Sequence, residues 1–586
     1  MARKLPPVDV VLVGFGWTGA IMAQELTDAG LEVLAIERGA WRDTPTHFPT
    51  TSAPDELRWY WRKEMFQDNA RDTLTFRNNR SQTALPMRRW GSFLPGEGVG
   101  GAGVHWNGQT WRFLPSDFEA ASHNSERYGP LPDGMTVQDY GVTYDELEPH
   151  FDRFEKLCGI SGKAGNLKGR IQEGGNPFEG WRSADYPNPP MHMTFSQRQF
   201  EKAAQDLGLH PFPGPSANMS RAYVNPLGCQ LAPCTYCGFC EKYGCGNYSK
   251  ASAQTTILPV LMKKPNFTLK THNEVLRVKL DNTGRRATGV IHVDVNGEEY
   301  EQPADLVILC AYQISNTRLM MLSGVGEIYN PVTGEGLVGK NYCYQVMSGA
   351  DVFFDDKFTN EFVGAGALGM CVDEYNGDNF DHSGLGFIGG GYIACWTTNA
   401  RPIESQPTPS GTPAWGSAWK KAVAANFLKS TSVGAHGSSM AYATNHLDLD
   451  PTYKDAYGRP LMRMTYDFTP NDLTMSAYLT ERVREIAERM GGREIKVNRR
   501  TTPYNSMPYQ TTHNTGGTIM GTTPKNSVVN RYLQSWDVSN LFVMGANVFP
   551  QNAGYNPTGT VAALAYWSAE AIRSQYLRSP GPLVQA

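Results

Sequence analysis

The sequence lacks a surplus of positive charge. Its 586 residues carry 53 Lys and Arg against 57 Asp and Glu, a formal net charge of −4 with a pI near 6.3. This balance indicates neither a basic surface for nucleic acid nor a polybasic patch for an anionic membrane. Long apolar runs are also lacking, because none approaches the roughly 18 residues that a membrane-spanning helix needs.

Targeting and repetitive segments are lacking too. The first residues, MARKLPPVDVVLVGFG, lead at once into a predicted buried strand and leave no room for a signal peptide. We therefore expect any export of the chain to depend on another protein. No internal repeat or low-complexity tract interrupts the sequence, and 586 residues suffice for a large core in two closely connected domains.

Cysteine is scarce outside one stretch. Of ten cysteines, five lie in GCQLAPCTYCGFCEKYGC: Cys229, Cys234, Cys237, Cys240 and Cys245. Thiolates at these short spacings can converge on one ion or cluster, because two-residue gaps let consecutive ligands meet on one side of a turn. A structural zinc, an iron–sulfur cluster and, in an exported protein, disulfides all remain open at this point.

A dinucleotide-binding pattern begins the chain. The stretch VDVVLVGFGWTGAIMAQELTDAGLEVLAIERG predicts strand, glycine turn, helix and second strand. Gly14, Gly16 and Gly19 form G-x-G-x-x-G, in which the glycines allow a tight turn, approach to a pyrophosphate and close helix packing. Glu37 follows the second strand, where it is expected to accept hydrogen bonds from a ribose diol. An acid there argues against NADP but does not separate NAD from FAD, and an ordinary tight turn is the plain alternative.

Three further motifs have a physical purpose. The stretch GEGVGGAGVHWNGQTWR is glycine-dense, as expected where backbone runs close against a flat ligand. In TTHNTGGTIMG, His513 lies beside two glycines, where an imidazole with a pKa of about 6.5 can act as a general base. In GYNPTGTVAALAYWSAEAI, Asn556 precedes Pro557 at the start of a helix predicted from about residue 558 to 573.

Together these motifs resemble the glucose–methanol–choline (GMC) oxidoreductase family over nearly the whole chain. The resemblance implies FAD, with His513 and Asn556 as the catalytic pair and with the helix dipole directed toward the flavin pyrimidine. His105 is then in the position of a histidine bonded covalently to the flavin 8α-methyl group, or of one that only packs beside the ring. The FAD-binding residues that this reading predicts are Gly14, Gly16, Gly19, Glu37, Gly100, Gly101, His105, Asn107, Asn547, Pro557 and Thr558.

The family implies an α/β (α+β) fold, a Rossmann-like FAD-binding domain with an interleaved antiparallel-sheet substrate domain. We expect the FAD-binding domain in residues 1–160, 221–346 and 506–578, and the substrate domain in 161–220 and 347–505. Residues 579–586 are expected to form a loose tail. GLGFIGGGYIACW and RPLMRMTYDF predict strands of the substrate-domain sheet, and LTERVREIAERMGG predicts an amphipathic helix with a glycine stop.

The cysteine stretch together with GVGGAGVHWNGQTWR resembles a GMC subgroup more closely, the flavoprotein (large) subunits of bacterial membrane-bound sugar-acid and polyol dehydrogenases. Gluconate 2-dehydrogenase and its 2-ketogluconate, sorbitol, fructose and glucose counterparts make up this subgroup. The resemblance implies a [3Fe–4S] cluster, a small subunit with a twin-arginine signal, a multihaem cytochrome c subunit and a location at the periplasmic face of the inner membrane. Related enzymes use fewer, differently spaced cysteines, so the ligand set and cluster type stay open.

The reaction that this reading predicts is hydride transfer from a secondary alcohol, with D-gluconate oxidised to 2-dehydro-D-gluconate. His513 takes the hydroxyl proton, Asn556 binds the same oxygen, and an unidentified Arg or Lys binds the substrate carboxylate. Three rivals remain: an oxygen-using GMC oxidase with a zinc-stabilised loop, a nonenzymatic assembly subunit, and an NAD-linked dehydrogenase. The last would leave the second glycine motif and the GYNPTGT helix without a function.

Overall fold

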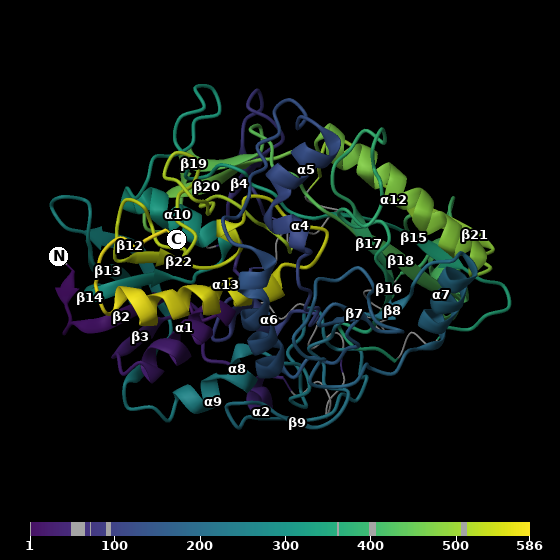
Figure 1. Cartoon of the computed structure of the whole chain (residues 1–586), viewed down its shortest axis with the longest axis horizontal. Helices are drawn as coiled ribbons and strands as arrows, with labels where there is room; N and C mark the ends of the chain where they lie inside the picture. The colour runs from purple at the N-terminus through teal and green to yellow at the C-terminus, as the bar shows by residue number, and fades with distance from the viewer. Residues whose placement is uncertain are drawn as a thin grey trace.

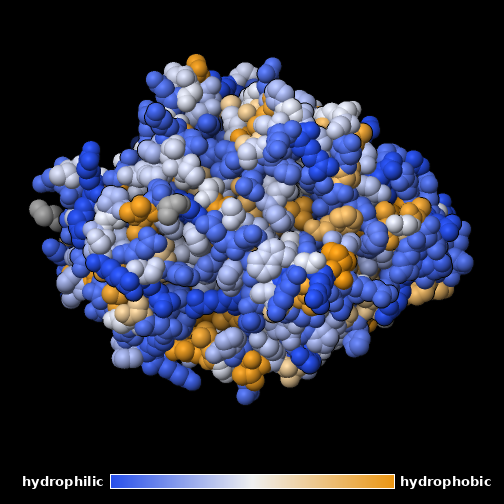
Figure 2. Space-filling model, in the orientation of Figure 1, coloured by the Kyte–Doolittle hydropathy of each residue, from blue (hydrophilic) through white to orange (hydrophobic). Residues whose placement is uncertain are grey.

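The computed structural model describes residues 2–48, 55, 65–70, 72–88, 95–359, 363–397, 406–505 and 512–585. It has two large sheets, one toward each end of the long axis in Figure 1, with helices packed around them. The mixed α/β class predicted from the sequence is confirmed. Within the described ranges, no helix is both long enough and apolar enough to cross a membrane. The side of the molecule in Figure 2 is mostly hydrophilic, with apolar side chains in small separate groups.

The larger sheet has eight strands, and its centre is parallel. Runs such as VVLV in the second strand are apolar without alternation, as expected where helices cover both faces of a parallel sheet. The fourteenth strand continues beyond the parallel part and joins an antiparallel ribbon. The strands are β11 (Phe267–Lys270), β3 (Val33–Ile36), β2 (Val8–Val13), β14 (Glu299–Leu309), β13 (Ala287–Asp294) and β12 (Asn273–Leu280), in that order, with β1 (Arg3–Lys4) and β22 (Leu541–Val543) also paired with β14.

Helices cover this sheet and approach the site from several directions. Helix α1 (Trp17–Asp28) packs against α13 (Thr558–Ala571), and α13 packs against α6 (Tyr144–Cys158), as Figure 1 shows. Helix α10 (Gln313–Ser323) packs against β12. Because α13 is apolar on nearly all sides, it is suited to burial between its neighbours.

The second sheet is antiparallel throughout. Helices α12 (Pro470–Arg489) and α7 (Phe195–Asp206) pack on it and share its apolar core. Tyr392 lies directly opposite His436 in the register of two central strands. The order is β21 (Glu494–Asn498), β15 (Val346–Phe353), β18 (Ser430–Gly437), β17 (Gly391–Trp396), β16 (Gly369–Val372) and β8 (Phe212–Pro213).

Two predicted elements differ in detail from the structure. The RPLMRMTYDF strand, β20 (Pro460–Thr465), belongs to a separate four-stranded sheet with β19 (His446–Lys454), β4 (Thr75–Arg77) and β5 (Leu85–Pro86). It pairs with β4 in parallel, because a distant part of the chain supplies that neighbour. The C-terminal helix ends at Ala571 and continues as one π-helical turn, Ile572–Tyr576.

The expected loose tail is wrong for the residues just after the last turn. Leu583 is buried, and its N–H donates to Gln534 Oε1 at 2.8 Å. Gln534 Nε2 in turn donates to the carbonyl of Gly581 at 2.8 Å. One buried glutamine side chain therefore fixes two points of the tail. The predicted domain boundaries stay a prediction, and residues 506–511 of the last FAD-binding segment lie outside the described residues.

Short elements connect these layers. The helical ones are α2 (Thr44–His47), η2 (Gly101–Val104), α4 (Pro115–Phe118), α5 (Ala120–Tyr128), α8 (Ala253–Thr256), α9 (Leu258–Leu261), α11 (Ser417–Asn426), η3 (Phe427–Lys429) and η4 (Ala546–Val548). The short strands are β6 (Asn166–Leu167), β7 (Arg170–Ile171), β9 (Tyr223–Val224) and β10 (Gln230–Leu231).

Candidate active site

A deep cavity lies at the carboxyl ends of β2, β3 and β14, where α/β sheets bind ligands. Gly14 has φ +95°, and a Cβ there would lie 2.7 Å from the carbonyl oxygen of Cys310. A Cβ on Gly19 would lie 2.3 Å from the Gly14 oxygen. A Cβ on Gly16, in contrast, would meet nothing nearer than the Cα of Gly101 at 4.0 Å. Gly14 and Gly19 are thus required by chain packing, whereas Gly16 leaves open the space that a pyrophosphate would occupy.

Glu37 is a buried carboxylate in the wall of this cavity. It accepts hydrogen bonds from the backbone N–H groups of Phe15 at 2.9 Å, Gly39 at 2.8 Å and Gly98 at 3.2 Å. A carboxylate has about four acceptor positions, so capacity remains for a ribose hydroxyl. The geometry therefore fits the ribose contact expected for this residue.

The second glycine loop, residues 96–112, faces the same cavity. Only some of the residues predicted in it to bind FAD line that cavity. Gly101 lines the cavity, as do the next two residues of η2. Gly100 donates its N–H to Phe15 at 2.7 Å, and a Cβ on it would lie 2.7 Å from Val104 rather than in the cavity. Asn107 accepts from the N–H of Gln109 at 3.0 Å and so stabilises the turn that follows.

His105 is buried, with its ring centroid 4.3 Å from that of Phe66. Within the described ranges its Nε2 has no hydrogen-bond partner. Burial, with the nearby charge of Lys250, lowers the pKa of His105 to about 3. The imidazole is therefore neutral and has one buried nitrogen that no described residue satisfies.

The two predicted catalytic side chains meet. Asn556 Nδ2 lies 2.9 Å from His513 Nε2, and the neighbouring Thr512, Pro557 and Thr558 line the cavity. Burial lowers the pKa of His513 to about 4, so the ring is neutral near pH 7 and can accept a proton. This contact brings together two motifs that lie far apart in the sequence.

Asn547 has a different environment from the one expected. Its side chain is fully buried, accepts from Asn316 Nδ2 at 3.0 Å and donates to Thr518 Oγ1 at 2.7 Å. Its neighbours Gly545 and Ala546 line the cavity instead. The Asn547 amide is therefore committed to holding the segment that carries the cavity wall.

Sequence reasoning missed a group of polar side chains next to the predicted catalytic pair, His513 and Asn556. The hydroxyl of Tyr392, on β17, lies 2.9 Å from Gln109 Oε1 and 3.0 Å from Asn556 Oδ1. His436, on β18, stacks on Tyr392 with centroids 4.8 Å apart and 17° between planes. Burial and the proximity of His513 lower the pKa of His436 to about 3. No local motif marks these residues, because the strand register of the second sheet brings them to the site.

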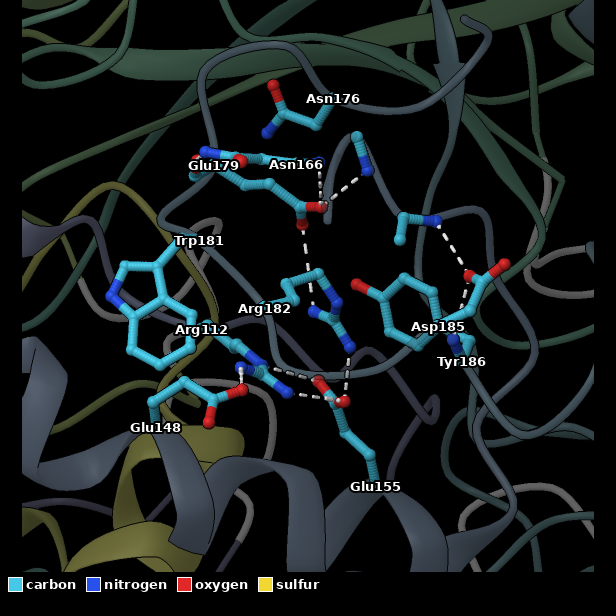
Figure 3. A network of polar contacts seen from close by, with 12 residues as sticks. Arg112, Glu148, Glu155, Asn166, Asn176, Glu179, Trp181, Arg182, Asp185 and Tyr186 are labelled. Atoms are coloured by element: carbon cyan, nitrogen blue, oxygen red, sulfur yellow. Dashed lines mark hydrogen bonds and ion pairs between the residues drawn. The ribbon is translucent and has the colours of Figure 1, made fainter. Parts of the chain in front are cut away.

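Buried ion pairs fix the end of the second glycine loop. Arg112 donates from Nε and Nη2 to Glu155 at 2.9 and 2.8 Å, and from Nη1 to Glu148 at 3.0 Å. Figure 3 shows Arg112 between these two carboxylates of α6, with Arg182 also bonded to Glu155. Losing one partner of a buried pair typically costs about 3–5 kcal/mol. The position of Trp111, next in the chain, is therefore strongly constrained relative to α6.

All ten cysteines are free thiols, so the disulfide alternative is wrong. Burial raises the pKa values of Cys234, Cys237 and Cys240, to about 11 for Cys240, and the charges of neighbouring thiols, Cys245 among them, add to the shift. Cys229 lies apart from them, beside Lys263. Among the residues that the structure describes, no group of three or more His, Cys, Asp or Glu side chains is arranged to hold a metal.

The cysteine loop, residues 229–245, contacts the second glycine loop directly. Lys250 is buried and donates to the carbonyl oxygens of Trp106 at 2.7 Å, Cys240 at 2.7 Å and Tyr243 at 2.9 Å. The backbone N–H of Lys242 donates to the carbonyl of His105 at 2.8 Å. Backbone of one loop is thus hydrogen-bonded to backbone or side chains of the other at two places.

Comparisons with known proteins cover the whole chain. Family models described as GMC oxidoreductase match residues 193–347 and 441–565. The chain is 50% identical to the gluconate 2-dehydrogenase flavoprotein of Pantoea cypripedii, over 100% of this chain and 97% of that protein. It is 27% identical to 2-methyl-1,2-propanediol dehydrogenase of Mycolicibacterium austroafricanum, over 98% of this chain and 97% of the other.

A solved structure shares the fold. The crystal structure of pyridoxine 4-oxidase from Mesorbium loti superposes with a TM-score of 0.57 at 18% identity, covering 97% of this chain and 99% of that one. Glycine turns, an open cradle at Gly16 and a His–Asn pair at one cavity accord with these matches. The chain belongs to the GMC oxidoreductases, FAD-dependent enzymes that act on CH–OH groups.

Proposed function

We propose that the chain is the flavoprotein subunit of a sugar-acid dehydrogenase that oxidises D-gluconate to 2-dehydro-D-gluconate. The observation that carries the proposal is the 2.9 Å contact between Asn556 Nδ2 and His513 Nε2, whose chain neighbours Thr512 and Pro557 line the cavity. A base and a hydrogen-bond donor at one point are what oxidation of an alcohol requires. The substrate assignment is supported by the relative of 50% identity, which is a gluconate 2-dehydrogenase flavoprotein.

The side chains divide the work of the reaction. FAD, when bound, supplies the acceptor for the hydride that leaves the carbinol carbon. The neutral His513 Nε2 takes the hydroxyl proton, and Asn556 Nδ2 donates to the same oxygen as negative charge develops on it. Helix α13 begins at the cavity wall, so its positive dipole end faces the cavity. Gly16, Gly101 and Glu37 would hold the pyrophosphate and ribose of the cofactor.

We further propose that His105 is bonded to the flavin 8α-methyl carbon. Its buried Nε2, which has no hydrogen-bond partner among the described residues, supports this, because a covalent bond would satisfy that nitrogen. Acid precipitation should leave yellow colour in the pellet of the wild-type protein, and His105→Ala should release it. Colour that stays in the wild-type supernatant would refute the bond.

An iron–sulfur cluster in the cysteine loop completes the proposal. When bound, such a cluster passes electrons one at a time, here to a cytochrome c subunit. The four neighbouring cysteines, Cys234, Cys237, Cys240 and Cys245, are the candidate ligands, and their side chains would have to turn toward one another to hold a cluster, because the described arrangement does not bring three of them to one point. Their loop lies against the second glycine loop. A [3Fe–4S] type, a small subunit with a twin-arginine signal and a periplasmic location follow from the resemblance alone.

Flavin bleaching without oxygen tests the substrate. The purified protein is mixed in turn with gluconate, 2-ketogluconate, sorbitol, fructose and glucose, and the loss of flavin absorbance is followed. Gluconate should bleach the flavin fastest, without need of any electron partner. Bleaching by another sugar but not by gluconate would reassign the substrate, and bleaching by none of them would overturn the proposed reaction.

Cysteine variants test the electron path. Cys237→Ser and Cys240→Ser should keep substrate-driven flavin reduction but lose transfer to the cytochrome subunit. Cys229→Ser is the matched control, because Cys229 lies apart from the other four. Variants count when flavin content and melting profile stay normal. Unimpaired transfer would refute the relay, whereas zinc in metal analysis together with rapid peroxide formation would favour the oxygen-using oxidase.

A further inference from the structure

Four side chains form one continuous polar chain beside the cavity. Gln109 Oε1, the Tyr392 hydroxyl and Asn556 Oδ1 are separated by 2.9 and 3.0 Å, and Asn556 Nδ2 then reaches His513 Nε2 at 2.9 Å. The second glycine loop, β17, the turn before α13 and the segment after residue 511 each supply one member. Tyr392 lies in the middle, with no exposed surface.

The number of hydrogens on each side chain determines which group donates and which accepts along this polar chain. A hydroxyl has one hydrogen, so Tyr392 can donate to only one of its two amide neighbours and must accept from the other. If Asn556 Nδ2 donates to His513, then Asn556 Oδ1 accepts from Tyr392, and the Gln109 amide must be turned so that Nε2, in place of Oε1, faces the Tyr392 hydroxyl and donates to it. The opposite direction would require a hydrogen on His513 Nε2, and that nitrogen could not take a proton. Only the first direction is compatible with His513 as a base.

Packing holds the Tyr392 ring in place. Its centroid lies 4.8 Å from His436, 4.7 Å from Trp111 and 5.9 Å from Tyr555. A Cβ on Gly559 would lie 2.1 Å from the Trp111 carbonyl oxygen, so the loop and the first turn of α13 are in close backbone contact. Burial raises the pKa of Tyr392 well above its usual value, and the hydroxyl therefore remains a donor across the working pH range.

We propose that Tyr392 is a positioning residue of the oxidation, because its hydroxyl holds the Asn556 amide with the NH₂ group toward His513 and the substrate oxygen. The inference rests on the proposed role of His513 as the base. Without the hydroxyl, the Asn556 amide is free to turn over and present Oδ1 at the same place. An oxygen there stabilises the protonated imidazole and repels the negative charge that develops on the alcohol oxygen.

The other titratable groups around His513 keep their charge state over the relevant range. Within the described part of the chain they are His436 and, through contacts with Asn514, Tyr312 and Tyr342. Burial lowers the pKa of His436 to about 3 and raises that of Tyr312 to about 12, with Tyr342 shifted further in the same direction. A change near pH 5 in the pH dependence of flavin reduction therefore reports protonation of His513.

Tyr392→Phe tests the inference, with Tyr555→Phe as the matched control. Tyr555 also stacks on Trp111 and is buried, but its hydroxyl donates to Asp373 and is not in the chain. Tyr392→Phe should lower the rate of flavin reduction at saturating substrate about 10- to 100-fold. The effect should be smaller than that of removing the Asn556 donor itself, because the amide is still present. KM should change little. The acid limb, the pH range in which the rate falls as His513 becomes protonated, should move up by about one pH unit, because Asn556 Oδ1 can then stabilise the imidazolium.

A second measurement does not depend on turnover. Diethylpyrocarbonate modifies neutral imidazole, so the pH dependence of His513 modification, read by peptide mass spectrometry, gives its protonation midpoint. The midpoint should rise in Tyr392→Phe and stay at the wild-type value in Tyr555→Phe. Equal midpoints and equal rates in the two variants, with normal melting profiles, would overturn the positioning role.

His513→Ala separates this inference from the proposed function. A wild-type rate of flavin reduction in His513→Ala would mean that the base assignment itself is wrong. Loss of reduction in His513→Ala, together with an unchanged rate and pH profile in Tyr392→Phe, would mean that only the positioning role is wrong. A Tyr392→Phe variant that loses rate in step with its control, without a change in acid limb, would also overturn it.

Discussion

The two walls of the cavity are built in different ways. The dinucleotide wall comes from one short stretch, Gly14 to Glu37, in which backbone shape and backbone N–H groups do most of the work. The proposed catalytic wall is formed by Thr512, Pro557 and Thr558. Directly behind it, distant segments bring together four side chains, Gln109, Tyr392, Asn556 and His513. Local sequence therefore specifies the first wall, whereas sheet register and loop packing specify the second. Substitutions in the two walls should consequently fail in different ways.

The largest effect should come from the catalytic wall. His513→Ala should lower the rate of substrate-driven flavin reduction by roughly two to four orders of magnitude, the usual contribution of a general base. FAD content and melting profile should remain normal, because the ring keeps some exposed surface despite the burial that lowers its pKa. Stopped-flow absorbance without oxygen measures the rate. A variant that reduces flavin like the wild type would remove the distinction between the two walls.

A pair of alanines should separate packing from cofactor contact within the dinucleotide wall. Gly14→Ala forces a Cβ against the Cys310 carbonyl at positive φ and should cost about 2–5 kcal/mol of folding stability. Gly16→Ala meets no such contact and has φ −89°, so the flavin-free fold should keep its stability. FAD affinity should instead fall by roughly tenfold or more, as for a clash of 1–2 kcal/mol.

Both alanine variants are best measured in a His105→Ala background, where FAD can be removed if it is covalently bound in the wild type. Denaturant unfolding of the flavin-free protein gives stability, and FAD titration gives affinity. Equal losses of stability in the two variants would contradict the separate roles assigned to Gly14 and Gly16.

The smallest effect concerns the pH dependence of flavin reduction, whose acid limb should lie below that of an ordinary histidine. Burial lowers the pKa of His513 to about 4, and the base works only when neutral, so flavin reduction should stay nearly constant down to about pH 5 and fall below it. A histidine with its ordinary pKa of about 6.5 would lose rate already near neutrality. Since the folded state takes up this proton later than the unfolded chain, His513 also makes folding less favourable as pH falls from about 6.5 to 4. An acid limb near pH 6.5 would contradict the buried environment.

Much of the fold and of the candidate site could be predicted from local patterns. The apolar runs of β2 and β14 and the proline before α13 indicate their own elements. The parallel pairing of β20 with β4 could not be predicted, because it depends on a neighbour far away in the chain. Tyr392 was missed for the same reason, because its role depends on distant segments and a tyrosine in an apolar strand is expected simply to pack in the core. The Asn547 contacts with Asn316 and Thr518 likewise depend on packing, not on motif.

Lys250 has a mechanical consequence. Its three carbonyl acceptors belong to two loops, so thermal displacement of the cysteine loop must carry the second glycine loop with it. We therefore expect the two loops to move together, so that groups held by each keep a fixed separation. If the proposed electron path runs from flavin at one loop to a cluster at the other, this single buried ammonium would keep their separation nearly constant.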